Sequence, residues 1–304
     1  MNDTFGTYHP IINFIYFCTV ILLGMFIMHP IFLCTAIIGA FTYSVFLNGK
    51  KAVRFNLIFL LPMMVLVSII NPLFNHRGMT ILFYFRDNPI TMESIVYGIF
   101  TGIMFAVIIL WFSCYNEVMT SDKFIYLFGK IIPALSLIFS MVLRFIPRFK
   151  EQLKIVYNAQ KCIGRDISSG TFLERMYYGI KIFSIMITWS LENSIETADS
   201  MRSRGYGLRG RTSFSIYRFD SRDTVVSVVL IMLIILVISG ILLGENSIIF
   251  FPLIKTSHIT IISVIVFIAY FLICFLPIIL NMIEIYILKR NKKSGDLDVS
   301  VYNK

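Results

Sequence analysis

Charged residues are scarce in this chain of 304 residues: Asp, Glu, Lys and Arg make up 14% of it, against 57% for apolar residues. A soluble globular domain usually carries about a quarter charged residues. Long apolar runs account for the shortfall, and this pattern excludes an ordinary soluble protein. We therefore predict an all-α polytopic membrane protein.

Residues that build metal and redox sites are also few. The five cysteines and four histidines are dispersed along the chain, and no pair has the spacing of a metal site. Four of the cysteines lie in apolar runs, so we interpret the cysteines as small buried hydrophobic residues. The sequence predicts no metal site, no haem and no other cofactor.

Nucleotide-binding and leader motifs are missing as well. The sequence has no glycine-rich Walker A motif, so we expect this chain not to bind ATP itself. Its loops hold no paired-aspartate motif for a prenyl diphosphate and its metal. Residues 1–10 contain no Lys or Arg, so the basic start of a cleavable signal peptide is absent. We expect the first apolar segment to remain in the mature protein.

Apolar runs long enough to cross a bilayer are abundant. A membrane-spanning helix needs about 17–25 predominantly apolar residues. Pro30 divides the first long run, because proline favours a helix start and disfavours helix in the residue before it. We expect about six transmembrane helices, at 11–28, 30–47, 55–73, 95–114, 224–243 and 259–288.

The net charge of +10 is a signal of topology, because Lys and Arg gather in cytoplasmic loops. They concentrate in the turn 48–54, in the tail after Leu288, and between Arg144 and Arg222, where fourteen Lys and Arg accompany seven Asp and Glu. All three segments lie inside the cell only if the apolar run Phe124–Leu143 lies along the membrane face. We therefore expect a multi-pass plasma-membrane protein with both termini cytoplasmic.

This topology divides the chain into four regions. Residues 1–114 form a four-span membrane region, 115–222 an interfacial and cytoplasmic domain of coupling helices, 223–288 a two-span membrane region, and 289–304 a basic tail. Residues 74–94 are expected to form a polar loop on the outer side. Asn71–Arg77, at the end of the third span and the start of this loop, is a candidate for contact with a substrate or a lipid head group, but a folded loop that caps the third span is the favoured interpretation.

The cytoplasmic domain is expected to contain two long helices. Pro147 is expected to begin the first helix. Thr171 has Glu174 three residues later, which is the spacing of a capping box, and it opens a second helix that continues to Arg204. The apolar middle of this helix, Ile180–Leu191, is too short to span a membrane. We expect it to pack beneath the membrane or against the first helix.

Both helices are expected to end at a glycine, Gly164 or Gly205, because glycine closes a helix in the left-handed conformation without a steric penalty. Arg202 and Arg204 lie in the last turn, where the helix dipole stabilises a cation by about 0.3–1 kcal/mol. A capped surface helix explains either end alone. Two similar ends suit a partner with two similar sockets, and an arginine binds a carboxylate through two hydrogen bonds.

These residues resemble those of the transmembrane T component of energy-coupling factor transporters, which are ABC-type importers of vitamins and metals with cobalt-uptake relatives. That family carries two Ala-Arg-Gly-like triplets at the ends of two cytoplasmic coupling helices. Ser203-Arg204-Gly205 is similar to the second triplet. Other similar segments, which extend the resemblance over nearly the whole chain, are Arg144–Pro147, Ala159–Lys161, His29–Pro30 and Asn71–Gly78.

The first triplet departs from the family pattern, because it reads Cys162-Ile163-Gly164 and lacks an arginine. Either Arg165 or Lys161 replaces the missing charge, or the first socket is held mainly by shape. The resemblance implies these ATPase-docking residues: Lys161, Cys162, Ile163, Gly164, Arg165, Arg202, Ser203, Arg204 and Gly205. Arg204 is expected to make the charge contact, and the two glycines are expected to terminate the helices. Arg202 and Arg165 are expected to act as supporting cations in the docking contacts.

The resemblance also implies a non-catalytic coupling subunit. Two ABC-type ATPase subunits would each bind one triplet end in a groove, and ATP hydrolysis would take place on those partners. Their closure would move the coupling helices, whose apolar faces in 124–143 and 172–191 would pass the movement to a separate substrate-capture membrane protein. The transported vitamin or metal ion would be selected by that capture protein.

Two other functions are weighed against this one. A membrane-embedded enzyme that modifies lipids or isoprenoids would need convergent carboxylates or a histidine cluster at one membrane face. A basic domain that binds anionic lipid or nucleic acid would fit the net charge of +7 over residues 144–222. The interleaved acidic residues argue against a nucleic-acid stripe, and we expect no nucleic-acid partner.

Overall fold

The structure is a computed structural model of the 304-residue chain. It describes residues 3–85, 88–129, 133–206, 217–244, 246, 248–256 and 260–293. The chain divides into two compact units, Met1–Lys123 with Tyr217–Lys304, and Phe124–Ile216. Of the expected basic tail, residues 289–293 belong to the last helix, and 294–304 lie outside the described residues.

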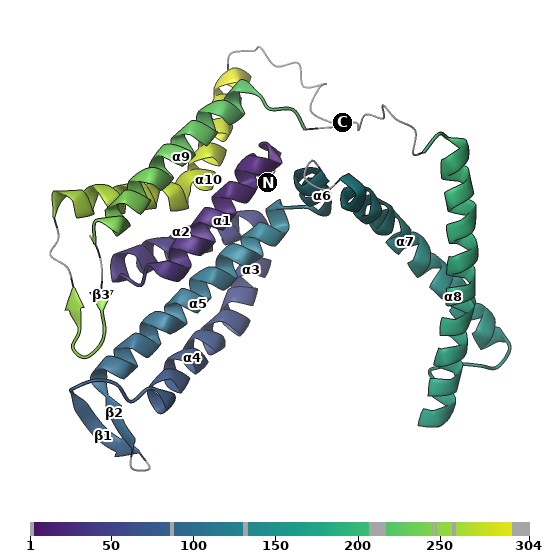
Figure 1. The fold of residues 1–304 in the computed structure, drawn as a ribbon, viewed down its shortest axis with the longest axis horizontal. Helices are drawn as coiled ribbons and strands as arrows, with labels where there is room; N and C mark the ends of the chain where they lie inside the picture. Colours follow the sequence, from purple (N-terminus) through teal and green to yellow (C-terminus); the bar gives the residue numbers. More distant parts are fainter. Residues whose placement is uncertain are drawn as a thin grey trace. The chain divides into compact units, whose positions relative to one another are not determined.

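The first unit is built from long apolar helices (Figure 1). Together with two short segments, α3 (Lys50–Phe55) and a π-helical turn (Asn56–Leu60), its helices are α1 (Pro10–Phe26), α2 (Pro30–Asn48), α4 (Leu61–Phe74), α5 (Met92–Val118), α9 (Ser221–Leu242) and α10 (Ile261–Lys293). Five of the described helical segments are long and apolar enough to cross a membrane: Pro30–Asn48, Lys50–Phe74, Met92–Val118, Ser221–Leu242 and Ile261–Arg290. Helix α1 is apolar and has 17 residues. The prediction of an all-α polytopic membrane protein is confirmed.

The break between α1 and α2 lies where the sequence predicts it. Helix α1 ends at Phe26, and Pro30 occupies the first position of α2. A proline is tolerated there because the backbone N–H of a first helical residue has no partner within its own helix. His29, the N-cap of α2, has the extended backbone that a residue before proline prefers.

Helices α4 and α5 pack with their backbones close together (Figure 1). A Cβ atom at Gly98 would lie 2.7 Å from the Ser68 carbonyl oxygen, and one at Gly102 would lie 2.7 Å from the Met64 carbonyl oxygen. The two glycines are four residues apart and therefore share one face of α5. Only glycine allows this approach, as in other membrane helix pairs with small residues at their interface.

Aromatic side chains fill the core of the first unit. Trp111 on α5 is fully buried, and its ring centroid lies 5.9 Å from that of Tyr16 and 6.5 Å from that of Tyr43. Phe5, in the short 3-10 helix Phe5–Thr7 before α1, lies 5.0 Å from Tyr16 in an edge-to-face arrangement. The first residues of the chain therefore belong to the core of this unit.

Hydrogen bonds also hold the first residues of the chain in place. The Asn281 side chain on α10 donates to Asp3 Oδ1 at 2.8 Å and accepts from the Thr4 backbone N–H at 2.7 Å. The Lys123 ammonium donates to the carbonyl oxygens of Gly6 at 2.6 Å and Val118 at 2.8 Å. Burial lowers the pKa of Lys123, and the nearby Asp3 carboxylate partly offsets this.

The segment 74–94 is more ordered than the expected polar loop. Strands β1 (Ile81–Phe85) and β2 (Asn88–Thr91) form an antiparallel hairpin. The folded segment before it contacts the helices on both sides. As expected, it caps the third span, because Asn75 is the C-cap of α4 and its N–H donates to the Asn71 carbonyl oxygen at 2.8 Å. It also meets the start of α5, where the side chains of Thr91 and Ser94 both donate to the Arg77 carbonyl oxygen at 2.9 Å. The first turn of a helix needs such polar partners, and α5 is the helix that follows. A shorter hairpin, β3 (Ile248–Ile249) with β4 (Lys255–Thr256), lies between α9 and α10.

The second unit contains two long helices, α7 (Pro133–Cys162) and α8 (Phe172–Ser203), preceded by the short α6 (Ser121–Gly129), which begins in the first unit. The prediction that Pro147 begins a helix is wrong, because α7 starts at Pro133 and passes through Pro147. An interior proline removes one backbone hydrogen bond. Apolar helices of this chain tolerate that loss elsewhere as well, since Pro72 lies within α4 and Pro277 within α10.

Helices α7 and α8 pack against each other through a small apolar cluster. Val156 of α7 is buried together with Ile182 and Met186 of α8, and the rings of Phe149 and Trp189 meet edge to face at 5.2 Å. The apolar middle of α8 therefore packs against the preceding helix. This confirms one of the two alternatives predicted for Ile180–Leu191, namely packing against the first helix. This cluster fixes the two helices as a pair.

Candidate functional site: the carboxyl ends of α7 and α8

Helix α7 ends in a Schellman motif built around Gly164. The Gly164 N–H donates to the Lys161 carbonyl oxygen at 3.0 Å, and the Arg165 N–H donates to the Gln160 carbonyl oxygen at 3.0 Å. Gly164 has a φ of +81°, and a Cβ atom there would meet open space. Glycine is therefore needed for its left-handed backbone and not because the site is crowded.

Helix α8 ends in the same motif around Gly205. The Gly205 N–H donates to the Arg202 carbonyl oxygen at 2.9 Å, and the Tyr206 N–H donates to the Met201 carbonyl oxygen at 3.0 Å. Gly205 has a φ of +76°. The prediction that both helices end at these two glycines is confirmed. Gly207, the next glycine in the sequence, lies outside the described residues.

The shared hydrogen-bond pattern aligns the two ends residue by residue. With Gly164 set equal to Gly205, Ile163 takes the position of Arg204. The other equivalent pairs are Lys161 with Arg202, Cys162 with Ser203, and Arg165 with Tyr206. Neither of the two candidate replacement cations, Lys161 and Arg165, therefore stands where Arg204 does.

The end of α8 presents its cations to the surroundings. Arg202, Ser203 and Arg204 are exposed. Within the part of the chain that the structure describes, no hydrogen bond or ion pair engages the guanidinium of Arg204. This end can offer a guanidinium to a carboxylate without first breaking an internal contact.

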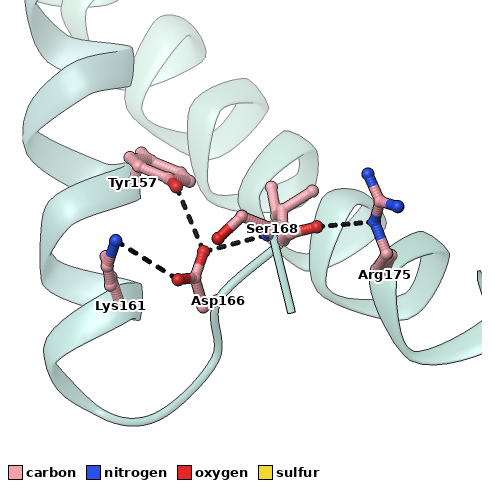
Figure 2. A network of polar contacts seen from close by, with 6 residues as sticks. Tyr157, Lys161, Asp166, Ser168 and Arg175 are labelled. Carbon is pink, nitrogen blue, oxygen red and sulfur yellow. Dashed lines mark hydrogen bonds and ion pairs between the residues drawn. The ribbon is translucent and has the colours of Figure 1, made fainter. Parts of the chain in front are cut away.

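At the end of α7, the cation Lys161 pairs with an acidic residue of the same chain. Figure 2 shows Lys161 and Tyr157 pointing toward the Asp166 carboxylate, which also receives the Ser168 backbone N–H. Lys161 Nζ lies 3.3 Å from Asp166 Oδ2, and the Tyr157 hydroxyl donates to Asp166 Oδ1 at 3.1 Å. These contacts, led by the hydrogen bonds from Ser168, hold the pKa of Asp166 far below its usual range. The same carboxylate raises the pKa of Lys161.

Arg165 is also held near the helix. Its side chain is half-buried, and a guanidinium nitrogen donates to Gln160 Oε1 at 3.4 Å. The exposed side chains of this end are Ile163, which is 66% exposed, Cys162, which we had expected to be buried, and Lys161, which is 55% exposed while paired with Asp166. At the position of Arg204 this end carries Ile163. The α7 end is therefore apolar where the α8 end is cationic.

The loop between the two helices is fixed by polar contacts at both sides. Arg175 Nε donates to the Ile167 carbonyl oxygen at 2.7 Å (Figure 2). At the start of α8, the Thr171 backbone N–H donates to Glu174 Oε2 at 2.8 Å, which is one half of the expected capping box. The helix start predicted at Thr171 is confirmed.

Sequence reasoning missed the role of Asp166, Tyr157 and Arg175. The signal for Asp166 was present, since an aspartate two residues before a serine in a short polar loop commonly accepts that backbone N–H. Tyr157 gave no comparable signal, because it lies nine residues earlier, in the helix. Its contact depends on how the loop folds back on α7.

Helix α8 also carries an exposed apolar stripe on the side away from its contact with α7. Residues three or four apart share this stripe, as expected for one face of a helix. Its members, all at least 44% exposed, are Leu173, Met176, Ile180, Phe183, Ile187, Leu191 and Ile195. The stripe is longer than the predicted apolar middle of the helix and continues toward its cationic end.

The sequence profile of CbiQ, described as "Cobalt transport protein", matches residues 10–214. This match covers more than half of the chain and includes both helix ends. The chain belongs to the CbiQ family. The resemblance deduced from the triplets is thereby confirmed.

Curated relatives of this CbiQ family member carry energy-coupling factor names. "Energy-coupling factor transporter transmembrane protein EcfT 1" of Listeria monocytogenes is 29% identical over 203 residues, which are 62% of this chain and 73% of that protein. The EcfT proteins of Lactococcus lactis and Bacillus subtilis are 28% and 27% identical over 212 residues, 65% of this chain and 79% and 80% of theirs. With its apolar helices, the chain is a multi-pass transmembrane component of an energy-coupling factor transporter.

Proposed function

We propose that this chain is the coupling subunit of an energy-coupling factor importer, and that the carboxyl ends of α7 and α8 each dock on one of two ABC-type ATPase subunits. The matched Schellman ends support this most directly, because two exposed helix ends of equal geometry lie on one packed pair of helices. Movement of either end is carried along a rigid helix.

Arg204 is the charge contact in this proposal. Its guanidinium is exposed at the tip of α8 and can bind a carboxylate in a socket of the ATPase through two hydrogen bonds. Arg202 and Ser203 border the same contact. Gly205 ends the helix there, so that Arg204 lies at the tip of α8 and its exposed side chain can enter a socket.

The α8 stripe serves as the contact with a separate substrate-capture membrane protein. Its exposed apolar side chains need a cover of the same chemistry, either lipid or an apolar membrane protein. Because the stripe and the docking end share one helix, a shift of the tip moves the stripe with it. Capture of the vitamin or metal ion then takes place on the partner, and the chain itself performs no catalysis.

The orientation that fits this proposal places both termini and both helix ends in the cytoplasm, where the ATPases and their ATP are found. The positive charge of residues 144–222 and of the end of α10 supports it through the positive-inside rule. The domain of coupling helices, 115–222, then lies on the cytoplasmic side of the membrane.

Replacement of Arg204 by glutamate tests the docking contact. We expect Arg204→Glu to weaken assembly with the ATPase subunits by about 2–5 kcal/mol, more than tenfold in the dissociation constant, because two carboxylates then meet in a desolvated socket. Co-expression of the chain with its ATPase subunits, followed by affinity purification, measures the loss as the yield of complex and of ATP-dependent uptake.

Arg148→Glu is the matched control. Arg148 is an exposed cation on α7 away from both helix ends, so the same change of charge there should leave the yield of complex within about twofold. Full assembly and full uptake by Arg204→Glu would refute the proposal. Equal losses in both variants would show that net charge, and not the α8 tip, controls assembly.

A further inference from the structure

We propose that the two docking ends recognise sockets of different chemistry: the α7 end enters an apolar socket with Ile163, and the α8 end enters an acidic socket with Arg204. The two ATPase subunits are then non-identical where they receive this chain. This inference rests on the proposed function and adds to it the nature of the two partners.

The structural alignment of the two ends is the first step. Both end in the same pair of hydrogen bonds around a left-handed glycine, so equivalent residues project from equivalent positions. Ile163 occupies the position of Arg204. A socket that binds one of these side chains by its chemistry is therefore poorly suited to the other.

The second step is that Lys161, the cation nearest the α7 tip, is already paired. Lys161 pairs with Asp166 at 3.3 Å, and that carboxylate is tied down further by the Tyr157 hydroxyl and the Ser168 backbone N–H. To serve as a docking cation, Lys161 would have to leave this network and expose Asp166 to the socket. An anionic socket would then face a second carboxylate, which is unfavourable.

Arg165 does not replace the missing arginine either. It follows the glycine, takes the position of Tyr206, and hydrogen-bonds to the Gln160 side chain at 3.4 Å. An acidic socket shaped for the Arg204 end would place its carboxylate against Ile163. A desolvated carboxylate without a partner is costly, whereas an apolar socket gains the burial of an isoleucine that is 66% exposed in the chain alone.

The natural thiol at the α7 tip allows a direct test. Cys162 is exposed and corresponds to Ser203, so a cross-linker can be placed at matched positions on the two ends. Both variants carry Cys18→Ala and Cys34→Ala and retain the buried Cys114 and Cys274. One keeps Cys162, and the other combines Cys162→Ser with Ser203→Cys.

Each full chain is purified, labelled with benzophenone-4-maleimide, then combined with both ATPase subunits to form the complex and irradiated. We expect mass spectrometry to find one ATPase subunit cross-linked to Cys162 and a different one to the Ser203→Cys thiol. The same ATPase subunit at both positions in equal proportion would overturn the inference and leave the proposed function intact. Adducts on neither ATPase would overturn the proposed function itself.

A substitution of Ile163 tests the chemistry of its socket. We expect Ile163→Arg to weaken assembly about tenfold or more and Ile163→Leu to preserve it, because a charge would be buried in an apolar socket. Ile155→Arg is the matched control, since Ile155 is 60% exposed on the same helix away from the tip. Tighter assembly of Ile163→Arg would show that the first socket is acidic, and unchanged assembly would show that no apolar socket encloses Ile163. Either result would overturn the inference.

Discussion

Asp166 determines the charge that the α7 end presents to a partner. Its carboxylate accepts from three groups, the Ser168 backbone N–H, the Tyr157 hydroxyl and the Lys161 ammonium. All three interact more strongly with the ionised carboxylate than with the neutral acid. The pKa of Asp166 is therefore held far below its ordinary value of 3.8.

This shift predicts how the loop between α7 and α8 responds to acid. A carboxylate whose pKa is lower in the folded state stabilises the fold above its unfolded pKa, and this stabilisation is lost as the pH falls through the lower folded value. We expect the Ser168 amide to stay protected from hydrogen exchange, after correction for the intrinsic rate, at pH 5, at pH 4 and still at pH 3, with loss only in stronger acid.

Asp166→Asn is the control for this titration. Its side chain still offers an oxygen to the Ser168 N–H but does not ionise, so the protection should not vary with pH over this range. Loss of protection in the natural chain between pH 5 and pH 3 would show that the carboxylate titrates near its ordinary value and would contradict the network.

Single residues with a strong local preference could be predicted from the sequence. Gly164, Gly205 and Thr171 each carry out a backbone function that few residue types can fill, so their roles were predictable. The pairing of Lys161 with Asp166 was not, because it depends on the path of the loop. Without it, the sequence leaves open which residue replaces the missing arginine.

Among the elements, α4 and α5 make a contact that depends on two glycines. We expect Gly98→Ala to destabilise the chain by about 1–3 kcal/mol, because the added methyl group would lie 2.7 Å from the Ser68 carbonyl oxygen and push the helices apart. Thermal unfolding of the detergent-purified protein measures this as a lower Tm.

Gly179→Ala is the matched control for this change. Gly179 lies within α8, and a Cβ atom there would have no neighbour within 4 Å among the described residues. Alanine is a better helix former than glycine by about 1 kcal/mol, so this variant should be at least as stable as the natural chain. An unchanged Tm for Gly98→Ala would mean that α4 and α5 are not in close contact.

Element boundaries could be predicted where one residue type decides them. Pro30 begins α2 as expected, since nothing competes with its preference for a helix start. The prediction that a helix begins at Pro147 was wrong, because the residues on both sides of it are helical and one lost hydrogen bond does not break α7. The β1–β2 hairpin was missed because the segment was interpreted from its balanced charges as a polar loop, although Asn88-Pro89 after the aromatic-rich run Ile81–Phe85 is a turn signal.

At the scale of the whole molecule, charge and hydropathy predict most of the architecture. The expected spans correspond to apolar helices of the structure, since a run of about 20 apolar residues has few alternatives to crossing a bilayer. The orientation and the division into a four-span region, coupling helices and a two-span region remain predictions from the distribution of Lys and Arg.

The most direct test of the account is the accessibility of the α8 tip to a thiol reagent that does not cross membranes. The Ser203→Cys variant, with Cys18→Ala, Cys34→Ala and Cys162→Ser, is compared in intact cells and in inside-out vesicles with and without bound ATPase subunits. We predict no labelling from outside, rapid labelling in vesicles stripped of ATPases, and protection when the ATPases are bound. Labelling from outside, or equal labelling of stripped and ATPase-loaded vesicles, would contradict the docking of this helix end on an ATPase.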